Sequence, residues 1–395
     1  MKPSIVFSSV LMALTTLAVS PLANAAASAE TLVARETQDV VAVPAQCRWT
    51  MWDSFKSNYI ENGRVVDNSD PRMITTSEGQ SYGLFFALLA NDKDAFAELL
   101  TWTENNLAEG DLTARLPAWL WGTMDSGRQG VIDQNSASDS DLWIAYSLME
   151  AGRIWDNYYY RTLGHLLALR ILKDETKVVD GVGTVLLPGR TGFDLGENHV
   201  RFNPSYVPMQ ILTRLAAENP NSAWKDIAVT SQKLILETMP KGFSPDWVEV
   251  TSSSILPDQV KPNIGSYDGI RTYLWAGMLS DKDQNKAALI EKMQPLVSIL
   301  ESTKRIPEKF DTQSGSTSGY SNLGLNASVI PLLMASGHKD LAMEFDAKIK
   351  EGFKDIKADN YYQNVLTLFS QGWVDGLYEF DETGKVVPHW DKACQ

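Results

Sequence analysis

Cysteine and histidine are scarce in this chain of 395 residues. There are two cysteines, and the four histidines are scattered at His165, His199, His338 and His389. This scatter offers no ligand spacing for zinc and no nucleophile paired with a base. The sequence also lacks a Gly-x-Ser-x-Gly elbow, a Walker loop and a His-Glu-x-x-His motif. We therefore expect neither a metal ion nor a cofactor.

Long apolar runs are missing everywhere except at the N-terminus. There, Lys2 precedes an apolar stretch from Ile5 to Val19, and Ala23-Asn24-Ala25 fits a small-x-small cleavage site. No later segment has about 18 unbroken apolar residues, so no membrane insertion is expected. The sequence predicts a signal peptide over residues 1–25 and a periplasmic or secreted protein. An uncleaved signal anchor is the alternative.

The remainder divides into a short leader and one domain. Residues 26–45 are small, polar and aperiodic, which predicts a flexible leader. Residues 46–395 keep a regular helical spacing without a linker, which predicts a single domain. Cys47 and Cys394 stand at its two ends, so a disulfide that ties the termini is the natural inference in an oxidising compartment. Two unpaired thiols are the alternative.

Basic residues are fewer than acidic residues in this chain. The 35 Lys and Arg residues face 49 Asp and Glu residues, which gives a net charge of −14. Nucleic acids need clustered cations for their phosphates, so we expect no nucleic-acid partner. Anionic polymers are disfavoured as substrates for the same reason, whereas a neutral polymer is unaffected.

Helical periodicity dominates what is present. Six times, a cluster of polar, Gly and Tyr residues opens onto an apolar run with helical spacing: Gln80–Ala90, Asp141–Gly152, Tyr206–Ala216, Tyr267–Leu279, Leu325–Ser336 and Asn364–Trp373. A more charged, amphipathic stretch precedes each run: Arg48–Tyr59, Lys93–Leu107, Asn157–Asp174, Ala223–Met239, Asp283–Glu301 and Lys339–Phe353. This alternation predicts an all-α fold, a closed double ring of six inner and six outer helices. Small β-hairpins are expected in the loops, at 178–187 and at 247–251 with 256–261.

Carboxylates recur where the inner helices begin. Glu78 lies in Thr75-Thr76-Ser77-Glu78-Gly79, where it either closes a capping box with Thr75 or faces a groove as a proton donor with a raised pKa. Asp139 and Asp141 open the second run, and they cannot both be simple N-caps. One capping and one groove-facing Asp, a cap with a solvated neighbour, and a weak calcium loop are the alternatives.

A third acidic cluster, Ser266-Tyr267-Asp268-Gly269-Ile270-Arg271, pairs Asp268 with Arg271 three residues later. Such a pair is either structural or holds a carboxylate ionised as a base. Tyr206 belongs to a fourth cluster, with an amide and a phenol suited to sugar hydroxyls. Among twelve tryptophans, Trp119, Trp121 and Trp247 stand beside Pro, Gly or Asp, either as sugar platforms or as packing. Carboxylates and aromatic residues around one groove favour cleavage of a glycosidic bond.

The segments Ser77-Glu78-Gly79-Gln80-Ser81-Tyr82-Gly83 and Leu116-Pro117-Ala118-Trp119-Leu120-Trp121-Gly122 resemble glycoside hydrolase family 8. The helix from Ala137 and the clusters 203–206 and 266–271 share this resemblance. It covers nearly the whole chain from about Cys47, and it is strongest for the periplasmic endo-β-1,4-glucanases that accompany bacterial cellulose synthase.

The resemblance implies an (α/α)6 barrel and an inverting mechanism. Glu78 would be the general acid and Asp268 the base. Asp139 matches an essential family residue near the cleaved sugar, interpreted here as a positioning residue. Tyr206 and Arg271 match positions around the water and the base. Ser140 departs from the Gly or Ala that is usual there, and we expect activity to survive this change.

The expected partner is β-1,4-glucan, together with a cellulose synthase export complex. Two alternatives remain open at this point. One is the same fold acting on xylan or chitosan, or more remotely a polysaccharide lyase. The other is a glucan-binding scaffold subunit without turnover, which would not need the pair Glu78 and Asp268.

Overall fold

The computed structural model describes residues 48–354 and 360–391. The expected signal peptide, the leader, Cys47 and Cys394 lie outside these ranges, so the disulfide stays a prediction. No helix in the two described ranges combines the length and the apolar character that a membrane span requires.

The described residues contain fourteen α-helices. Their bounds are α1 Thr50–Tyr59, α2 Ser77–Leu89, α3 Lys93–Leu107, α4 Ser138–Ile154, α5 Tyr158–Asp174, α6 Met209–Glu218, α7 Trp224–Glu237, α8 Ile270–Met278, α9 Lys286–Lys292, α10 Gln294–Thr303, α11 Leu323–Ser328, α12 Ile330–Ala335, α13 Lys339–Phe353 and α14 Tyr361–Val374. The expected ranges Lys93–Leu107 and Lys339–Phe353 coincide with α3 and α13. Two expected helices are each divided in two, because Pro295 and Pro331 start a new helix at its second position.

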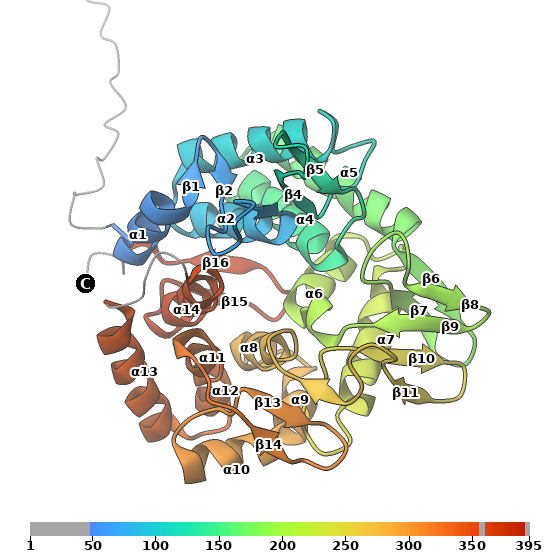
Figure 1. Ribbon diagram of the computed structural model, residues 1–395, viewed down its shortest axis with the longest axis vertical. Coiled ribbons are helices and arrows are strands. Elements are labelled where there is room, and N and C mark those ends of the chain that lie inside the picture. Colours follow the sequence, from blue (N-terminus) through green and yellow to red (C-terminus); the bar gives the residue numbers. More distant parts are fainter. Residues whose placement is uncertain (1–47, 355–359, 392–395) are drawn as a thin grey trace, which may run out of the picture. The chain divides into compact units, whose positions relative to one another are not determined.

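The apolar helices contact one another in a closed circuit. α2 packs on α4, α4 on α6, α6 on α8, α8 on α11, and α11 on α14. Phe369 of α14 then meets α2, with its ring centroid 5.0 Å from Tyr82 and 4.7 Å from Phe86. In Figure 1 these helices lie inside, and α3, α5, α7 and α13 lie outside them. The helices predicted to be inner thus contact one another in chain order, while the complete double ring stays a prediction.

Large aromatic side chains fill the centre of this circuit. Phe85 and Trp143 lie 4.8 Å apart, Trp143 and Trp275 5.2 Å, and Trp275 and Phe369 5.0 Å. Burial of each such ring stabilises the fold by about 1.5–3 kcal/mol. A helix surrounded by neighbours has no polar face, which explains why the inner runs read as almost continuously apolar.

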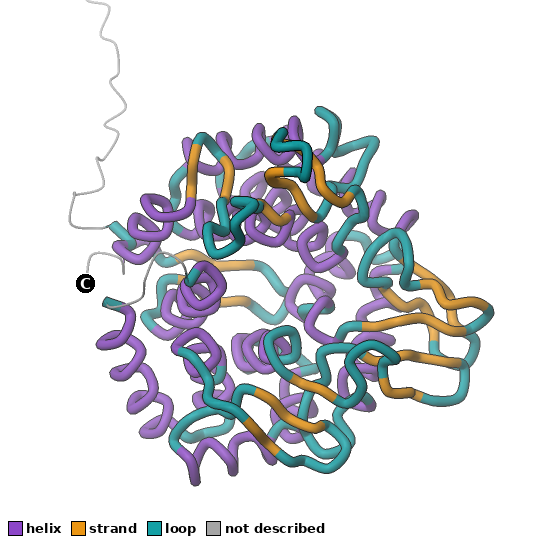
Figure 2. Tube along the Cα trace, viewed as in Figure 1, coloured by secondary structure: helices purple, strands orange, loops and turns teal. Residues whose placement is uncertain are grey.

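Short strands occupy the connections (Figure 2). The expected hairpins are present, as β6 Thr176–Val179 with β7 Gly183–Leu186, and β10 Val248–Thr251 with β11 Ile255–Pro257. The second belongs to a four-stranded sheet with β8 Asp194–Gly196 and β9 His199–Phe202. The other strands are β1 Ile60–Glu61, β2 Arg64–Val65, β3 Thr75–Thr76, β4 Leu120–Thr123, β5 Gln129–Asp133, β12 Ile264–Gly265, β13 Lys309–Asp311, β14 Thr317–Ser318, β15 Tyr378–Phe380 and β16 Val386–Pro388. The sequence analysis underestimated this strand content.

Three of these strands set the starts of inner helices. β3 runs directly into α2, β9 leads into the 3-10 helix Pro204–Tyr206 before α6, and four residues separate the end of β12 from the start of α8. Hydrogen bonding to neighbouring strands fixes where each helix begins, and with it the side chains of the first turn.

Candidate active site

Glu78 is freed from helix capping by its neighbour. The Thr76 side chain accepts a hydrogen bond from the backbone N–H of Gly79 at 3.0 Å, so Thr76 is the N-cap of α2. The capping box between Thr75 and Glu78 is thus wrong, because the Thr75 hydroxyl instead donates to the Val65 carbonyl at 2.6 Å. The Glu78 carboxylate is left to form an ion pair with Arg271.

Asp139 lies within the first turn of α4 and does not cap it. The cap position is Ala137, which has no side-chain hydrogen bond. The Asp139 Oδ1 accepts the backbone N–H of Ser140 at 2.8 Å, and its Oδ2 lies 3.3 Å from Nη1 of Arg271. The Ser140 hydroxyl donates to the Ala137 carbonyl at 2.8 Å and lies 2.6 Å from the Ser77 hydroxyl. Ser140 therefore ties α4 to the start of α2 and makes no side-chain bond to either aspartate.

Asp268 precedes its helix, since α8 begins at Ile270 and not at the expected Tyr267. The Ser266 side chain does not cap α8. Asp246 takes this role, because its Oδ1 accepts the backbone N–H groups of Ser266 at 2.7 Å and Gly269 at 2.8 Å. A Cβ at Gly269 would come within 2.7 Å of the Ser244 carbonyl oxygen, so this tight approach requires glycine.

Asp268 receives two hydrogen bonds, one on each oxygen. Nη2 of Arg271 lies 3.1 Å from Oδ1, and the indole Nε1 of Trp247 lies 3.0 Å from Oδ2. Two donors, one on each oxygen, fix the plane of the carboxylate. They orient Asp268 as a group that can accept a proton.

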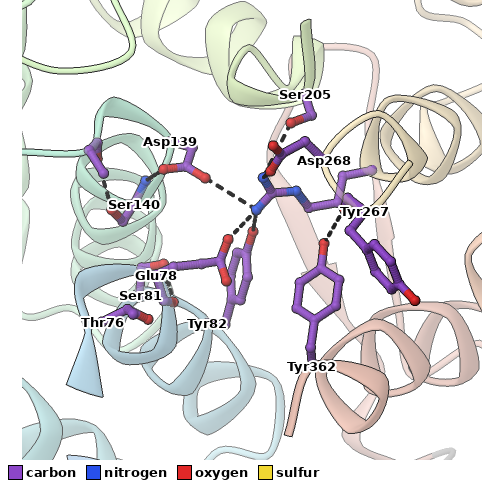
Figure 3. Close-up of polar contacts among 12 residues, drawn as sticks. Thr76, Glu78, Ser81, Tyr82, Asp139, Ser140, Ser205, Tyr267, Asp268 and Tyr362 are labelled. Carbon is purple, nitrogen blue, oxygen red and sulfur yellow. Dashed lines mark hydrogen bonds and ion pairs between the residues drawn. The ribbon is translucent and has the colours of Figure 1, made fainter. Parts of the chain in front are cut away.

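Arg271 joins the three carboxylates (Figure 3). Its Nη1 contacts Glu78 and Asp139 and lies 3.1 Å from the Tyr82 hydroxyl, while Nη2 contacts Asp268 and lies 3.3 Å from the Ser205 hydroxyl. Only 2% of the arginine side chain is exposed. A planar guanidinium with fixed donors can hold several acceptors in one geometry, which a lysine cannot.

Two of the three carboxylates are open to solvent. The side chains of Glu78 and Asp268 are 23% and 26% exposed, whereas Asp139 is 4% exposed. Burial raises the pKa of Glu78, although Arg271 opposes this shift. Burial likewise raises the pKa of Asp139, to about 7, against the attraction of Arg271. The site thus combines a partly exposed carboxyl group whose pKa is raised, Glu78, with a second partly exposed carboxylate that accepts two hydrogen bonds, Asp268.

Aromatic rings pack against Trp247, which donates a hydrogen bond to Asp268. The Trp247 ring stacks on Phe193 at 5.9 Å and meets Tyr206 edge-on at 5.7 Å. The Arg201 guanidinium covers Trp247 at 4.1 Å, and that of Arg271 lies 5.5 Å from the Tyr206 ring. The structure therefore brings the predicted residues Tyr206, Trp247 and Arg271 together with the carboxylates.

Comparisons with known proteins identify relatives of this chain. Residues 27–376 match the model of glycosyl hydrolases family 8. The chain is similar to an endoglucanase of Escherichia coli K12, at 44% identity over 89% of this chain and 94% of that protein. It is also similar to the crystal structure of an endo-1,4-D-glucanase from Vibrio fischeri ES114, at 57% identity and a TM-score of 0.85, over 87% of this chain and 99% of that one.

The chain belongs to glycosyl hydrolases family 8. The fold of the endoglucanase Cel10 from Klebsiella pneumoniae is similar as well, with a TM-score of 0.65 at 23% identity over 82% of this chain and 98% of that one. Among the described residues of this family 8 member, no group of three or more His, Cys, Asp and Glu side chains is placed to hold a metal ion.

Three predicted residues lie apart from the carboxylate cluster. Asp141 is fully buried, and its raised pKa follows from burial and from the nearby Glu175 carboxylate. A direct contact between Asp141 and a sugar is therefore not supported. Trp121 is 9% exposed, with Arg64 over its ring at 4.3 Å and Trp102 against it at 5.3 Å. Its role as a sugar platform is likewise unsupported.

Trp119 is partly buried next to β4, and its carbonyl accepts the backbone N–H of Ser77 at 3.0 Å. This bond contributes to placing the start of α2. A platform role for the Trp119 ring stays a prediction.

Sequence reasoning missed four residues of the site. Tyr82 and Ser205 hold Arg271, and Asp246 caps the segment that carries Asp268. The Tyr362 hydroxyl donates to the Tyr267 carbonyl at 2.6 Å, which links α14 to the segment before α8 (Figure 3). For Tyr82 a signal existed, since it lies four residues after Glu78 on the same face of α2.

Proposed function

We propose that this protein cleaves internal β-1,4-glucosidic bonds of cellulose-type glucan with inversion at the anomeric carbon. The observation that carries the proposal is the Arg271 guanidinium, which contacts Glu78 on one nitrogen and Asp268 on the other. Both carboxylates remain partly exposed, and each has a different environment. Their environments separate their roles in the way that glycoside hydrolysis requires.

In the proposed reaction, Glu78 donates its proton to the leaving glycosidic oxygen. Asp268 accepts a proton from a water molecule, which attacks the anomeric carbon from the opposite face of the ring. Asp139 is nearly buried beside both groups and serves as a positioning residue for the sugar that is cleaved. Tyr206 and Trp247 would contact the sugar or hold the water. In this scheme neither carboxylate forms a covalent bond to the sugar.

We infer further that the inner and outer helices form an (α/α)6 barrel. The closed circuit of helix contacts and the fold similarity to family 8 structures support this inference. For the setting, we propose export to the periplasm or beyond and a role beside a cellulose synthase complex. The signal-like N-terminal sequence and the similarity to bacterial endoglucanases support that setting.

The test replaces each proposed reacting carboxylate by its amide. Glu78→Gln and Asp268→Asn are expected to abolish release of reducing ends from soluble cellulose derivatives, with unchanged circular dichroism. Asp340→Asn, an exposed residue in the first turn of α13, is the matched control and should retain full activity. Parental activity in either amide variant would refute the assignment of roles.

Two further measurements separate the alternatives. Proton NMR of the first sugar anomer released distinguishes inversion from retention; inversion needs carboxyl groups about 6.5–9.5 Å apart and retention about 5–5.5 Å. A panel of cellulose, xylan and chitosan defines the substrate. Binding of glucan without any turnover by the parent protein would instead indicate a scaffold subunit.

A further inference from the structure

A groove of about 520 Å³ runs along the outer helix α3, and the proposed reaction makes no use of it. Its lining consists of Asn62, Ala97, Glu98, Thr101, Trp102, Asn105 and Asn106. All but Asn62 come from α3, where Glu98, Thr101, Trp102 and Asn105 follow the spacing of one helix face. We call these seven residues the Trp102 groove.

The turn that carries Asn62 is anchored firmly on α3. Asn62 and Gly63 connect β1 to β2, both with positive φ, at 53° and 77°. A Cβ on Gly63 would approach the Glu98 carbonyl oxygen to 2.4 Å, so the turn lies directly on the helix. The Gln80 amide also donates to the Gly63 carbonyl at 3.1 Å. Asn62 is therefore held over the groove by buried contacts.

Two side-chain amides of the groove are available for hydrogen bonds to a ligand. Asn62 and Asn105 are exposed, and within the described part of the chain no protein group hydrogen-bonds to either side-chain amide. Each amide offers two donor hydrogens and an acceptor oxygen, a combination that matches sugar hydroxyl groups. Glu98 is the one charged lining residue, and no cation lines the groove. This lining suits a neutral, hydroxyl-rich ligand better than an anionic one.

Trp102 supplies the flat apolar surface. It is partly exposed in the groove, and its ring meets Trp121 edge-on at 5.3 Å with an angle of 78°. Behind Trp121 lies Arg64, whose Nε donates to the Thr75 hydroxyl at 2.7 Å. The Trp102 ring is thus supported by a rigid stack and does not have to be ordered when a ligand binds.

We propose that the Trp102 groove is a second binding site for a neutral β-glucan chain, separate from the carboxylate cluster. The C–H face of a glucosyl ring would lie on Trp102, and its hydroxyls would bond to Asn62 and Asn105. The choice of glucan as the ligand rests on the proposed function. The site would retain long or insoluble chains near the enzyme without contact with the reacting bond.

The experiment measures binding and turnover separately. Binding to neutral hydroxyethyl cellulose is measured by affinity electrophoresis in a Glu78→Gln background. Trp102→Ala is expected to weaken this binding about three- to tenfold. In the enzyme that retains Glu78, the same change should lower the rate on insoluble cellulose and leave kcat/KM for cellohexaose within about twofold.

Two further variants guard against indirect effects. Asn62→Gly combined with Asn105→Ala removes both amides while it keeps the positive φ that the turn requires. Trp102→Ala could lower thermal stability because it removes the packing against Trp121, and in that case the double variant is the deciding test. Weaker glucan binding by the double variant, with unchanged turnover of cellohexaose, supports the second site. Tyr158→Ala removes an 82% exposed aromatic ring on α5 and is the control with unchanged binding.

The outcomes are distinguishable from a failure of the proposed function. Parental glucan binding in both groove variants overturns the second site, even if the enzyme hydrolyses glucan. If the parent protein hydrolyses no glucan but binds it in a manner that depends on Trp102, the site stands and the proposed function falls. If the groove variants instead lose capture of a protein and retain glucan binding, the glucan proposal is overturned.

Discussion

The indole N–H of Trp247 donates to Asp268, with 3.0 Å between Nε1 and Oδ2. Trp247 is itself held from two sides, by stacking on Phe193 and by the Arg201 guanidinium over its ring. Arg201 is fixed in turn by a two-point contact with Asp258, at 2.6 and 3.1 Å. The four-stranded sheet therefore sets the orientation of the proposed catalytic base.

Loss of the indole donor should slow the reaction more than it weakens binding. A hydrogen bond to a charged group is worth about 1.5–3 kcal/mol, so we expect Trp247→Phe to lower kcat about tenfold or more. The thermal midpoint should change little, because phenylalanine still stacks on Phe193. Steady-state kinetics on cellohexaose provides the measurement. Trp373→Phe in the last turn of α14 is the matched control, and an equal loss of kcat there would contradict this role.

Removal of the buried guanidinium should destabilise the fold in a manner that depends on pH. Arg271→Met leaves Glu78, Asp139 and Asp268 without their cation, and breaking a buried ion pair costs about 3–5 kcal/mol. Arg271 opposes the raised pKa values of Glu78 and Asp139, so its loss raises them further. Protonation at low pH relieves the repulsion, and the destabilisation should be larger at pH 8 than at pH 5.

Urea unfolding of Arg271→Met at the two pH values tests this prediction. Arg128→Met, on an exposed turn, serves as the control and should show no such difference. A loss of stability that is the same at both pH values would mean that charge repulsion is not the cause.

The buried pair Asp141 and Glu175 should make the fold less stable as the pH rises. Burial raises the pKa of Glu175 from 4.5 to about 8, and that of Asp141 well above its usual range. A raised carboxyl pKa means that the folded state binds more protons than the unfolded state between the two values. The stability is therefore fully present below about pH 4.5 and is lost as the pH rises through about 8.

Glu175→Gln should flatten this dependence, because the substituted side chain cannot ionise. The Ser136 hydroxyl, 2.5 Å from Glu175 Oε1, keeps an acceptor in the amide oxygen. We expect the fall in thermal midpoint between pH 5 and pH 8 to be smaller in the variant than in the parent protein. Parallel curves for the two proteins would count against the shared burial of this pair.

Ser140 offers a test of the link between α2 and α4. Its one hydroxyl proton goes to the Ala137 carbonyl, so the Ser77 hydroxyl donates to Ser140. Ser140→Ala leaves the buried Ser77 hydroxyl unpaired and should cost about 1–3 kcal/mol in the free energy of unfolding. The double variant with Ser77→Ala should recover part of this loss, since both partners are then apolar. Purely additive effects in urea unfolding would contradict the coupling, and activity should survive in both variants.

Local signals in the sequence located most helices. The outer helices α3 and α13 have clear amphipathic spacing, and Asp92 at the N-cap marks the start of α3. Glu78, Asp139 and Asp268 were likewise visible as carboxylates at helix starts. Their meeting on Arg271 was not, because contacts such as that between Glu78 and Arg271 span 193 residues.

The remaining errors have geometric causes. Two residues along an α-helix correspond to a rotation of about 200°, so Asp141 faces away from the cluster that Asp139 joins. Asp246 lies 20 residues before Ser266 and reaches the start of α8 because the intervening loop folds back. No local sequence pattern predicts this contact. Trp121 resembles an exposed platform in sequence, yet Arg64 and Trp102 cover it from distant segments.

Phe369 of α14 contacts Tyr82 and Phe86 of α2, so the last inner helix completes the circuit by packing against the first. Until α14 has been synthesised, the aromatic side chains of α2 that Phe369 contacts lack this cover. A chain that ends before residue 361 would expose these apolar side chains to solvent. Such fragments should aggregate rather than persist as smaller folded units. Stable folding of the N-terminal helices therefore requires that α14 has been synthesised.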